Sequence, residues 1–217
     1  MGKSLKQINK ENARDEKVQE AAFLLFADQT IEGVSMGDIA KAAEIGRATL
    51  FRHYSNKTEL AVAICETQWK AYLEEIKERS AGFLSEAVPA IARLNFVLEC
   101  CIEMYQKHRT LLRYSNDLKH YMMHAKEENI QFKSLHKVRD SVKDYFHRMY
   151  IKAEEDKSFR TDISEDEFIR ITICSLLLVC MDYADGFIPG IEKDIDYTSE
   201  LEKRKEMIME YVRCDGV

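Results

Sequence analysis

Two short amphipathic segments, separated by three residues, lie between residues 35 and 54 and constrain the fold more than any other feature. Ser35 and Asp38 stand three residues apart, the spacing of a capping box, in which each side chain bonds the other residue's backbone N–H. This predicts a helix that begins after Ser35 and continues to about residue 43. Its apolar face would be narrow and made of Met36, Ile39, Ala40 and Ala43.

The second segment follows the turn 44–46 and is predicted to be a helix over residues 47–54. We expect one face to be apolar, with Leu50, Phe51 and Tyr54 packed inward. The opposite face would present Arg47, Thr49, Arg52 and His53. Two short helices joined in this way are typical of a helix-turn-helix, in which the second helix enters the major groove of DNA.

The rest of the chain is predicted to be helical as well, because 217 residues include only 8 glycines and 2 prolines and lack hairpin signals. The fold class is therefore all-α. We expect an N-terminal DNA-binding domain over residues 1–57 and a larger helical domain over residues 58–217. Residues 1–12 are expected to fray. The remaining helices are predicted at about 12–28, 56–79, 83–106, 110–124, 128–155, 165–185 and 197–213.

The charge is unevenly distributed along the chain. The whole sequence carries a net charge of −6, but residues 1–57 carry +1 and the remainder carries −7. Local charge decides whether a surface binds nucleic acid, so the acidic total does not exclude a DNA-binding head. The longest apolar run, Leu176–Met181, is far shorter than the roughly 20 residues of a membrane span. With no secretory signal at the N-terminus, a soluble cytoplasmic protein without a membrane partner is expected.

The cysteines and histidines do not form a recognisable chemical site. None of the six cysteines belongs to a Cys-x-x-Cys pair, and most lie among apolar residues, which favours buried packing over zinc binding. His120 and His124 stand one helical turn apart, but no third ligand is near, so a solvated helix face is the preferred interpretation. With no nucleophile motif or phosphate loop, neither an enzyme, a cofactor nor a metal is predicted.

Three stretches resemble the TetR family of bacterial repressors. Residues 18–27 (VQEAAFLLFA) are similar to the family's first helix, and residues 34–43 (VSMGDIAKAA) are similar to its second. The closest likeness is in residues 48–60 (ATLFRHYSNKTEL), which resemble the recognition helix and the start of the fourth helix. The resemblance covers about a fifth of the chain.

By resemblance, Ser35 would cap the bracing helix and contact a phosphate, while Arg47, Ala48 and Thr49 would face base edges or the backbone. His53 and Lys57 would bind phosphate. Thr49, Arg52, His53 and Lys57 are also expected, from the residues alone, to be exposed donors near a helix N-terminus. The sequence departs from the family pattern at Gly46, Ala48 and Phe51, where Ser or Thr, Gly, and Tyr are usual. The missing hydroxyls at 46 and 51 each remove one expected DNA contact.

The resemblance also implies that the larger domain encloses a small-molecule effector and that helices 165–185 and 197–213 form a homodimer. Candidate effector-contacting residues are Trp69, Phe96, Cys100, Met104, Tyr121, Phe146 and Cys174. The predicted function is a transcriptional repressor that binds a palindromic operator as a dimer and is released by the effector. An activator or ligand-independent DNA-binding protein of the same fold, or a thiol-based redox sensor, remain alternatives.

Overall fold

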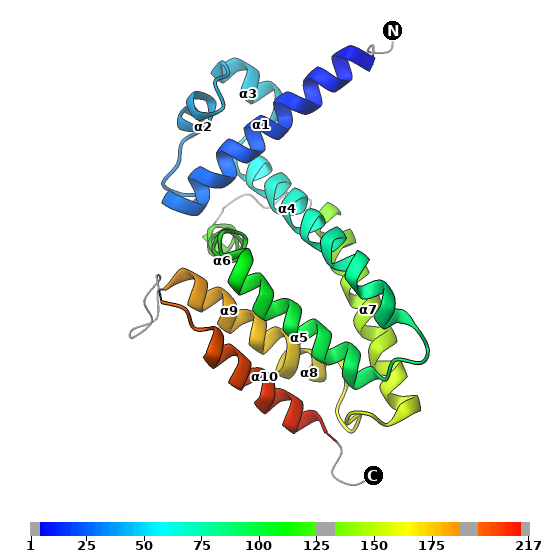
Figure 1. The fold of residues 1–217 in the computed structure, drawn as a ribbon. Coiled ribbons are helices and arrows are strands. Elements are labelled where there is room, and N and C mark those ends of the chain that lie inside the picture. Colours follow the sequence, from blue (N-terminus) through cyan, green and yellow to red (C-terminus); the bar gives the residue numbers. More distant parts are fainter. Residues whose placement is uncertain (1–4, 125–132, 187–194, 214–217) are drawn as a thin grey trace. The chain divides into compact units, whose positions relative to one another are not determined.

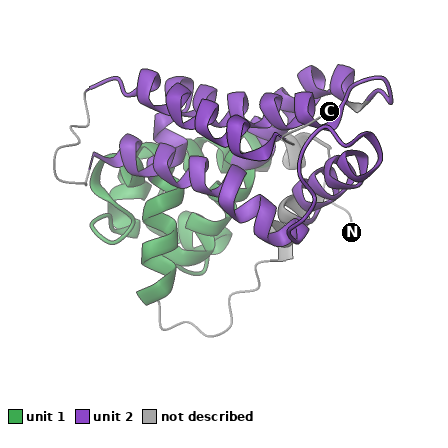
Figure 2. Cartoon of the chain, turned by 90° about the horizontal axis from the view of Figure 1, so that it is seen from below, with its two compact units in different colours: residues 1–68, 114–133 green, residues 69–113, 134–217 purple. Residues whose placement is uncertain are grey.

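The computed structural model describes residues 5–124, 133–186 and 195–213, and every regular element in these ranges is a helix (Figure 1). The all-α prediction is confirmed. The chain divides into two compact units, coloured separately in Figure 2. Unit 1 comprises residues 1–68 and 114–133, and unit 2 comprises residues 69–113 and 134–217. This division lies at different positions from the boundary at residue 57 expected from the sequence.

Unit 1 is built from α1 (Leu5–Gln29), α2 (Met36–Ala42), α3 (Arg47–His53), the start of α4 (Lys57–Ser80) and the end of α6 (Arg109–His124). Helix α1 begins at Leu5, within the segment that the sequence analysis expected to fray. The apolar residues of the first four helices meet in one core, whose members are less than 3% exposed. They include Val18, Ala22, Phe26, Ile39, Ala40, Leu50, Leu60 and Ile64.

The turn between α1 and α2 depends on Gly33. A Cβ atom at this position would lie 2.5 Å from the carbonyl oxygen of Gln29, a distance that real Cβ atoms essentially never show. Only glycine therefore allows the chain to double back so closely against the end of α1. The turn sets where α2 begins.

The second half of α6 packs within the N-terminal unit, which the sequence did not predict. Tyr114 is fully buried, its ring contacts Phe23 and Phe26 of α1, and its hydroxyl donates to the carbonyl of Ala61 in α4. Three residues further along, the Asp117 carboxylate accepts the backbone N–H of Ile31 at 2.6 Å. The end of α6 is thus an integral part of unit 1.

Unit 2 contains the remainder of α4, the 3₁₀ turn η1 (Ala81–Leu84), α5 (Ala90–Lys107), α7 (Lys133–Asp156), α8 (Glu165–Ile169), η2 (Arg170–Cys174), α9 (Ser175–Asp185) and α10 (Thr198–Val212). Helices α5, α9 and α10 pack against one another and lie side by side in Figure 1. Helix α5 begins seven residues later than predicted, because Pro89 immediately precedes its first turn.

The predicted helix 165–185 is interrupted by a π-helical turn. Ser164 caps its start by accepting the N–H of Glu167, as expected for a serine followed three residues later by an acid. The η2 segment then inserts a wider turn before α9, and the Thr172 hydroxyl bonds the carbonyl of Phe168 at 2.6 Å. Such a turn shifts the faces of the helix on either side of it.

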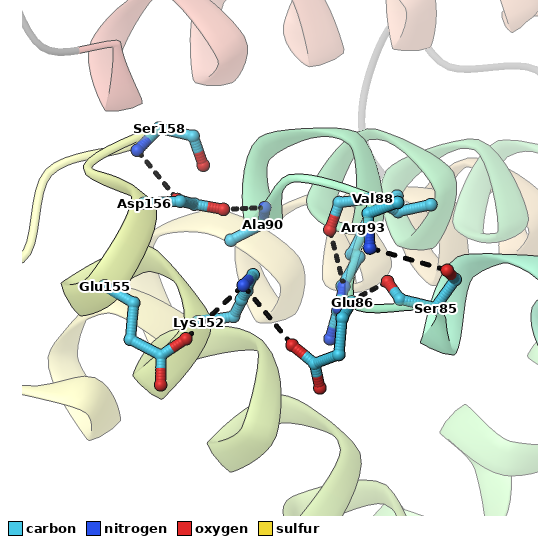
Figure 3. A network of polar contacts seen from close by, with 10 residues as sticks. Ser85, Glu86, Val88, Ala90, Arg93, Lys152, Glu155, Asp156 and Ser158 are labelled. Carbon is cyan, nitrogen blue, oxygen red and sulfur yellow. Dashed lines mark hydrogen bonds and ion pairs between the residues drawn. The ribbon is translucent and has the colours of Figure 1, made fainter.

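A polar network fixes the start of α5 on the end of α7 (Figure 3). The Asp156 carboxylate accepts the N–H groups of Ala90 and Ser158, both at 2.9 Å. The Ser158 hydroxyl accepts the N–H of Ile91 at 3.0 Å. Because Pro89 precedes α5 and has no side-chain cap, these groups satisfy helix donors that would otherwise be unbonded.

Asp156→Ala is expected to destabilise the protein by about 1 kcal/mol at neutral pH, as loss of a helix cap does. Burial alone would raise the pKa of this carboxyl, but hydrogen bonds from Ser158 and Ala90 outweigh it and lower the pKa. The carboxylate therefore contributes stability above its unfolded pKa, and this contribution is lost as the pH falls through the folded pKa. Urea unfolding should show a difference at pH 7 that shrinks toward pH 3, and a pH-independent difference would contradict this account.

Candidate nucleic-acid interface

The start of α2 is fixed by the capping box predicted from the sequence. The Ser35 hydroxyl accepts the N–H of Asp38 at 3.2 Å, and the Asp38 carboxylate accepts the N–H of Ser35 at 3.0 Å. The Ser35 hydroxyl also donates to Asp38 at 2.5 Å, and these bonds lower the pKa of Asp38. The single hydroxyl proton of Ser35 is donated to Asp38, so Ser35 could donate to a phosphate only by giving up that hydrogen bond.

The turn that separates the two helices contains a residue in an unusual conformation. Glu44 has a positive φ of 54°, a region that non-glycine residues rarely adopt. Its carboxylate pairs with Lys17 of α1 at 2.5 Å, and this hydrogen bond lowers the pKa of Glu44. This ion pair links the turn to helix α1.

Helix α3 is anchored to the core of unit 1 at its centre and its end. Leu50 is completely buried, and Tyr54, just after the last turn, is 6% exposed. The Tyr54 hydroxyl donates to Asp15 at 2.6 Å and accepts from Gln19 at 2.8 Å, both on α1. Burial, followed by the bond to Asp15, raises the pKa of this phenol. These contacts fix which side of α3 faces outward.

The outward side of α3 carries the predicted groove-facing residues. Arg47, Ala48 and Arg52 are exposed, and Thr49 is half-buried. Neither arginine forms an ion pair with another residue in the described part of the chain. Arg47 lies against α2, since a Cβ added at Gly37 would be 3.7 Å from its guanidinium carbon. Two unpaired positive charges therefore flank the outer surface of this helix.

Phe51 lies on the outer side of α3 as well, and the expectation that it packs inward with Leu50 and Tyr54 is wrong. Its side chain is 45% exposed. Successive helix residues are rotated by about 100°, so a residue directly after a buried one is turned away from the core. Leu50 and Tyr54, four residues apart, occupy the single inward stripe that a two-turn helix offers.

His53 and Lys57 lie at the end of α3 and the start of α4. His53 is half-buried, and Lys57 donates to the carbonyls of Glu32 and Val34 at 3.0 and 2.9 Å. The Lys57 ammonium also lies 5.6 Å from the centre of the Tyr121 ring, and burial lowers its pKa. An ammonium has three N–H donors, so one remains available for a phosphate.

The candidate effector residues fall in both units. Trp69, Phe96, Cys100, Met104, Phe146 and Cys174 belong to unit 2, and Phe96, Cys100 and Met104 are buried there on α5. Phe96 stacks on Phe83, with ring centres 4.3 Å apart. Tyr121 instead belongs to unit 1, where its hydroxyl lies 3.2 Å from that of Thr58.

Two polar residues inside unit 2 were not singled out from the sequence. Arg93 is buried, and its guanidinium donates to the carbonyls of Val88 and Ser85 at 3.2 and 3.0 Å (Figure 3). The Tyr145 hydroxyl is buried and has no hydrogen-bond partner among the described residues. Burial raises the pKa of Tyr145, while the charge of Arg93 opposes this. A tyrosine flanked by Asp144 and Phe146 carries no sequence signal that distinguishes it from an ordinary half-buried ring.

The five cysteine thiols among the described residues lack the lowered pKa that typifies redox-sensing cysteines. Burial raises the pKa of Cys100 to about 11 and those of Cys65 and Cys180 to about 12, and it also raises the pKa of Cys101 and Cys174. A thiolate is the reactive form, so these environments favour inert packing. Within residues 5–124, 133–186 and 195–213, no three metal-binding side chains come together, and no helix is long and apolar enough to cross a membrane.

Comparisons with known proteins point to the same part of the chain. Residues 19–64 match the family model for bacterial regulatory proteins of the tetR family. The HTH-type transcriptional regulator SAB2452 of Staphylococcus aureus (strain bovine RF122 / ET3-1) is 26% identical over 54% of this chain and 63% of its own length. The regulator SAR2658 of strain MRSA252 is 28% identical over 48% of this chain. The match spans just over half of that relative, at 53%.

Solved structures with the same fold cover nearly the whole chain. A regulatory protein in the tetR family from Rhodococcus RHA1 superimposes with a TM-score of 0.68 at 16% identity, over 94% of this chain and 98% of its own. FadR from Bacillus subtilis, in complex with stearoyl-CoA, gives 0.67 at 11% identity, over 91% and 99%. At such identities the likeness establishes the fold. Together with the helix-turn-helix geometry, the family match shows that residues 19–64 form a DNA-binding domain of the TetR type, on a chain whose fold is that of TetR-family regulators.

Proposed function

We propose that the protein is a transcriptional repressor that binds a near-palindromic DNA operator as a homodimer and is released by a small-molecule effector. The observation that carries the DNA-binding part is the outer face of α3, where Arg47 and Arg52 are exposed and unpaired within the described chain. A helix held by Leu50 and Tyr54 and presenting such a face suits the major groove, which is about 12 Å wide. In a dimer, two such helices would enter successive grooves about 34–36 Å apart.

Dimerisation is supported by apolar side chains left uncovered on unit 2. Ile171 and Leu178 stand seven residues apart on the η2–α9 segment and are 39% and 48% exposed. Met207 and Tyr211, one turn apart on the neighbouring α10, are 71% and 44% exposed. A second copy of the chain would bury these groups, and a dimer interface on the same two helices is what the family resemblance leads us to expect.

Effector binding is supported by the interior of unit 2. It contains the buried Phe96 ring, on which the half-buried Phe83 stacks, and the buried Tyr145 hydroxyl, a donor that a bound molecule could engage. FadR, of similar fold, is in complex with stearoyl-CoA, which is consistent with a small-molecule effector here. Helices α4 and α6 each continue from one unit into the other, so a ligand that favours one conformation of unit 2 can act on unit 1 through them.

Lys57 provides a quantitative test of the proposed DNA contact. If its remaining N–H binds a phosphate, Lys57→Ala should weaken binding to all duplexes alike and reduce the slope of log K against log salt by about 0.9. The duplex would be one recovered by in vitro selection with the full-length protein, titrated by fluorescence anisotropy across a salt series. Lys77→Ala, an exposed lysine further along α4, is the matched control and should leave the slope unchanged.

If Lys57→Ala kept the wild-type slope of log K against log salt, this would count against a contact between Lys57 and a phosphate. A failure of the wild-type protein to select any duplex would count against the proposed function as a whole. The redox-sensor alternative is opposed by the raised thiol pKa values, and would gain support only if mild oxidation altered DNA affinity.

A further inference from the structure

Phe51 is an exposed aromatic side chain on the recognition helix whose role the proposed function leaves open. Its ring is 45% exposed, and no other ring contacts it among the described residues. Ala48, three residues earlier on the same helix, is also exposed. Residues three apart on a helix are neighbours, so the two side chains form one small apolar patch on the outer side of α3.

The position of the patch follows from the buried side of α3. Leu50 and Tyr54 define the inward direction, and Phe51 is rotated about 100° from Leu50. Arg47 and Arg52 are exposed on either side of the patch. The apolar surface therefore lies between two cations, in the part of the helix that the proposed function places in the major groove.

The chemistry of phenylalanine limits what it can contact there. Its ring has no donor or acceptor, so it can bond neither a phosphate nor the polar edge of a base. The major-groove edges of the four base pairs offer one apolar group, the 5-methyl of thymine. We propose that Phe51, together with Ala48, recognises thymine in the operator through this methyl group, an inference that rests on the proposed function.

The flanking charges favour DNA over an apolar protein surface as the occupant of this patch. Docking an apolar protein would bring Arg47 and Arg52 toward a surface that cannot compensate them, and burial of unpaired charge is costly. A duplex supplies phosphates for the arginines and methyl groups for the ring at the same time. Phe51 then determines sequence preference, while the two arginines supply affinity.

The test uses the full-length protein and the tightest duplex recovered by in vitro selection. Each thymine is replaced in turn by deoxyuridine, which removes the 5-methyl group and keeps the base pair. Burial of one methyl is worth about 0.8 kcal/mol, so at least one replacement in each half-site should weaken wild-type binding about fourfold. In Phe51→Ala this sensitivity should disappear, whereas in Phe51→Leu, which keeps an apolar side chain, most of it should remain.

Thermal unfolding by circular dichroism provides the folding control, and equal melting temperatures are expected because the side chain is exposed. The inference is overturned, with the proposed function intact, if the duplex binds tightly and no thymine replacement matters. It is equally overturned if the fourfold loss persists in Phe51→Ala, since another side chain must then read the methyl. Failure to select any duplex would instead overturn the proposed function itself.

Discussion

Replacing Arg52 by glutamate is expected to reduce operator affinity about 100-fold while leaving the fold intact. The side chain is exposed on the outer face of α3 and has no ion-pair partner among the described residues. A charge-assisted hydrogen bond from arginine to a phosphate contributes about 1.5–3 kcal/mol, and a carboxylate in its place would face the phosphates with the wrong charge. Fluorescence anisotropy with the selected duplex at fixed salt measures the loss.

Arg148→Glu is the matched control for this variant. Arg148 is exposed on α7 in unit 2, and its replacement changes the net charge by the same amount. General repulsion between a more acidic protein and DNA would weaken both variants equally. We expect a large loss of affinity for Arg52→Glu alone, and similar losses for the two variants would refute a direct contact at Arg52.

Tyr114→Ala is expected to have the largest effect on stability, with a loss of about 3–5 kcal/mol. This tyrosine is fully buried in unit 1, with ring centres of Phe23 and Phe26 at 5.3 and 6.3 Å. Removing the ring leaves a cavity between α6, α1 and α4. The change is measured by urea unfolding followed by circular dichroism at neutral pH.

Tyr114→Phe separates packing from hydrogen bonding at the same site. It keeps the ring and removes only the hydroxyl that donates to Ala61, so a loss of about 1 kcal/mol is expected. Hydrogen exchange should also locate the effect of Tyr114→Ala in α1 and α4. A loss for Tyr114→Ala as small as that for Tyr114→Phe would mean that the end of α6 does not form part of this core.

The helix-turn-helix could be predicted from the sequence because its signals are local. The Ser35–Asp38 capping box, the turn at 44–46 and the inward Leu50 each depend on residues within one or two helical turns of one another. The cap of α4 is equally local, with Asn56 accepting the N–H of Glu59 at 2.7 Å. Interactions among residues so close in sequence determine the local backbone conformation without help from distant segments.

Features that depend on partners distant in sequence could not be predicted. Phe51 was assigned to the core because its residue type is apolar, and a helix of two turns is too short for periodicity to distinguish an inward from an outward aromatic ring. The placement of Tyr114 and Asp117 in unit 1 depends on contacts about 90 residues away in sequence, with Phe23 of α1 and with Ile31 just after it. Nothing in the local sequence of α6 indicates which helix it will cover.

The π-helical turn at 170–174 illustrates the same limit on a smaller scale. An unbroken apolar run over 176–181 indicates a helix, but a single wide turn before it changes which residues face outward. The exposed Ile171 and Leu178 therefore follow from the structure and not from the pattern. The resemblance names a pair of helices for the proposed dimer face, but the sequence pattern does not indicate which of their residues are exposed.

Hydroxyl-radical footprinting of the full-length protein on its selected duplex tests the central claim most directly. A dimer that inserts two α3 helices into DNA should protect two symmetric half-sites whose centres lie about one helical turn, 34–36 Å, apart. Both protections should be lost together in Arg52→Glu. A single unsymmetric protected site, or protection unchanged in that variant, would contradict the placement of α3 in successive major grooves.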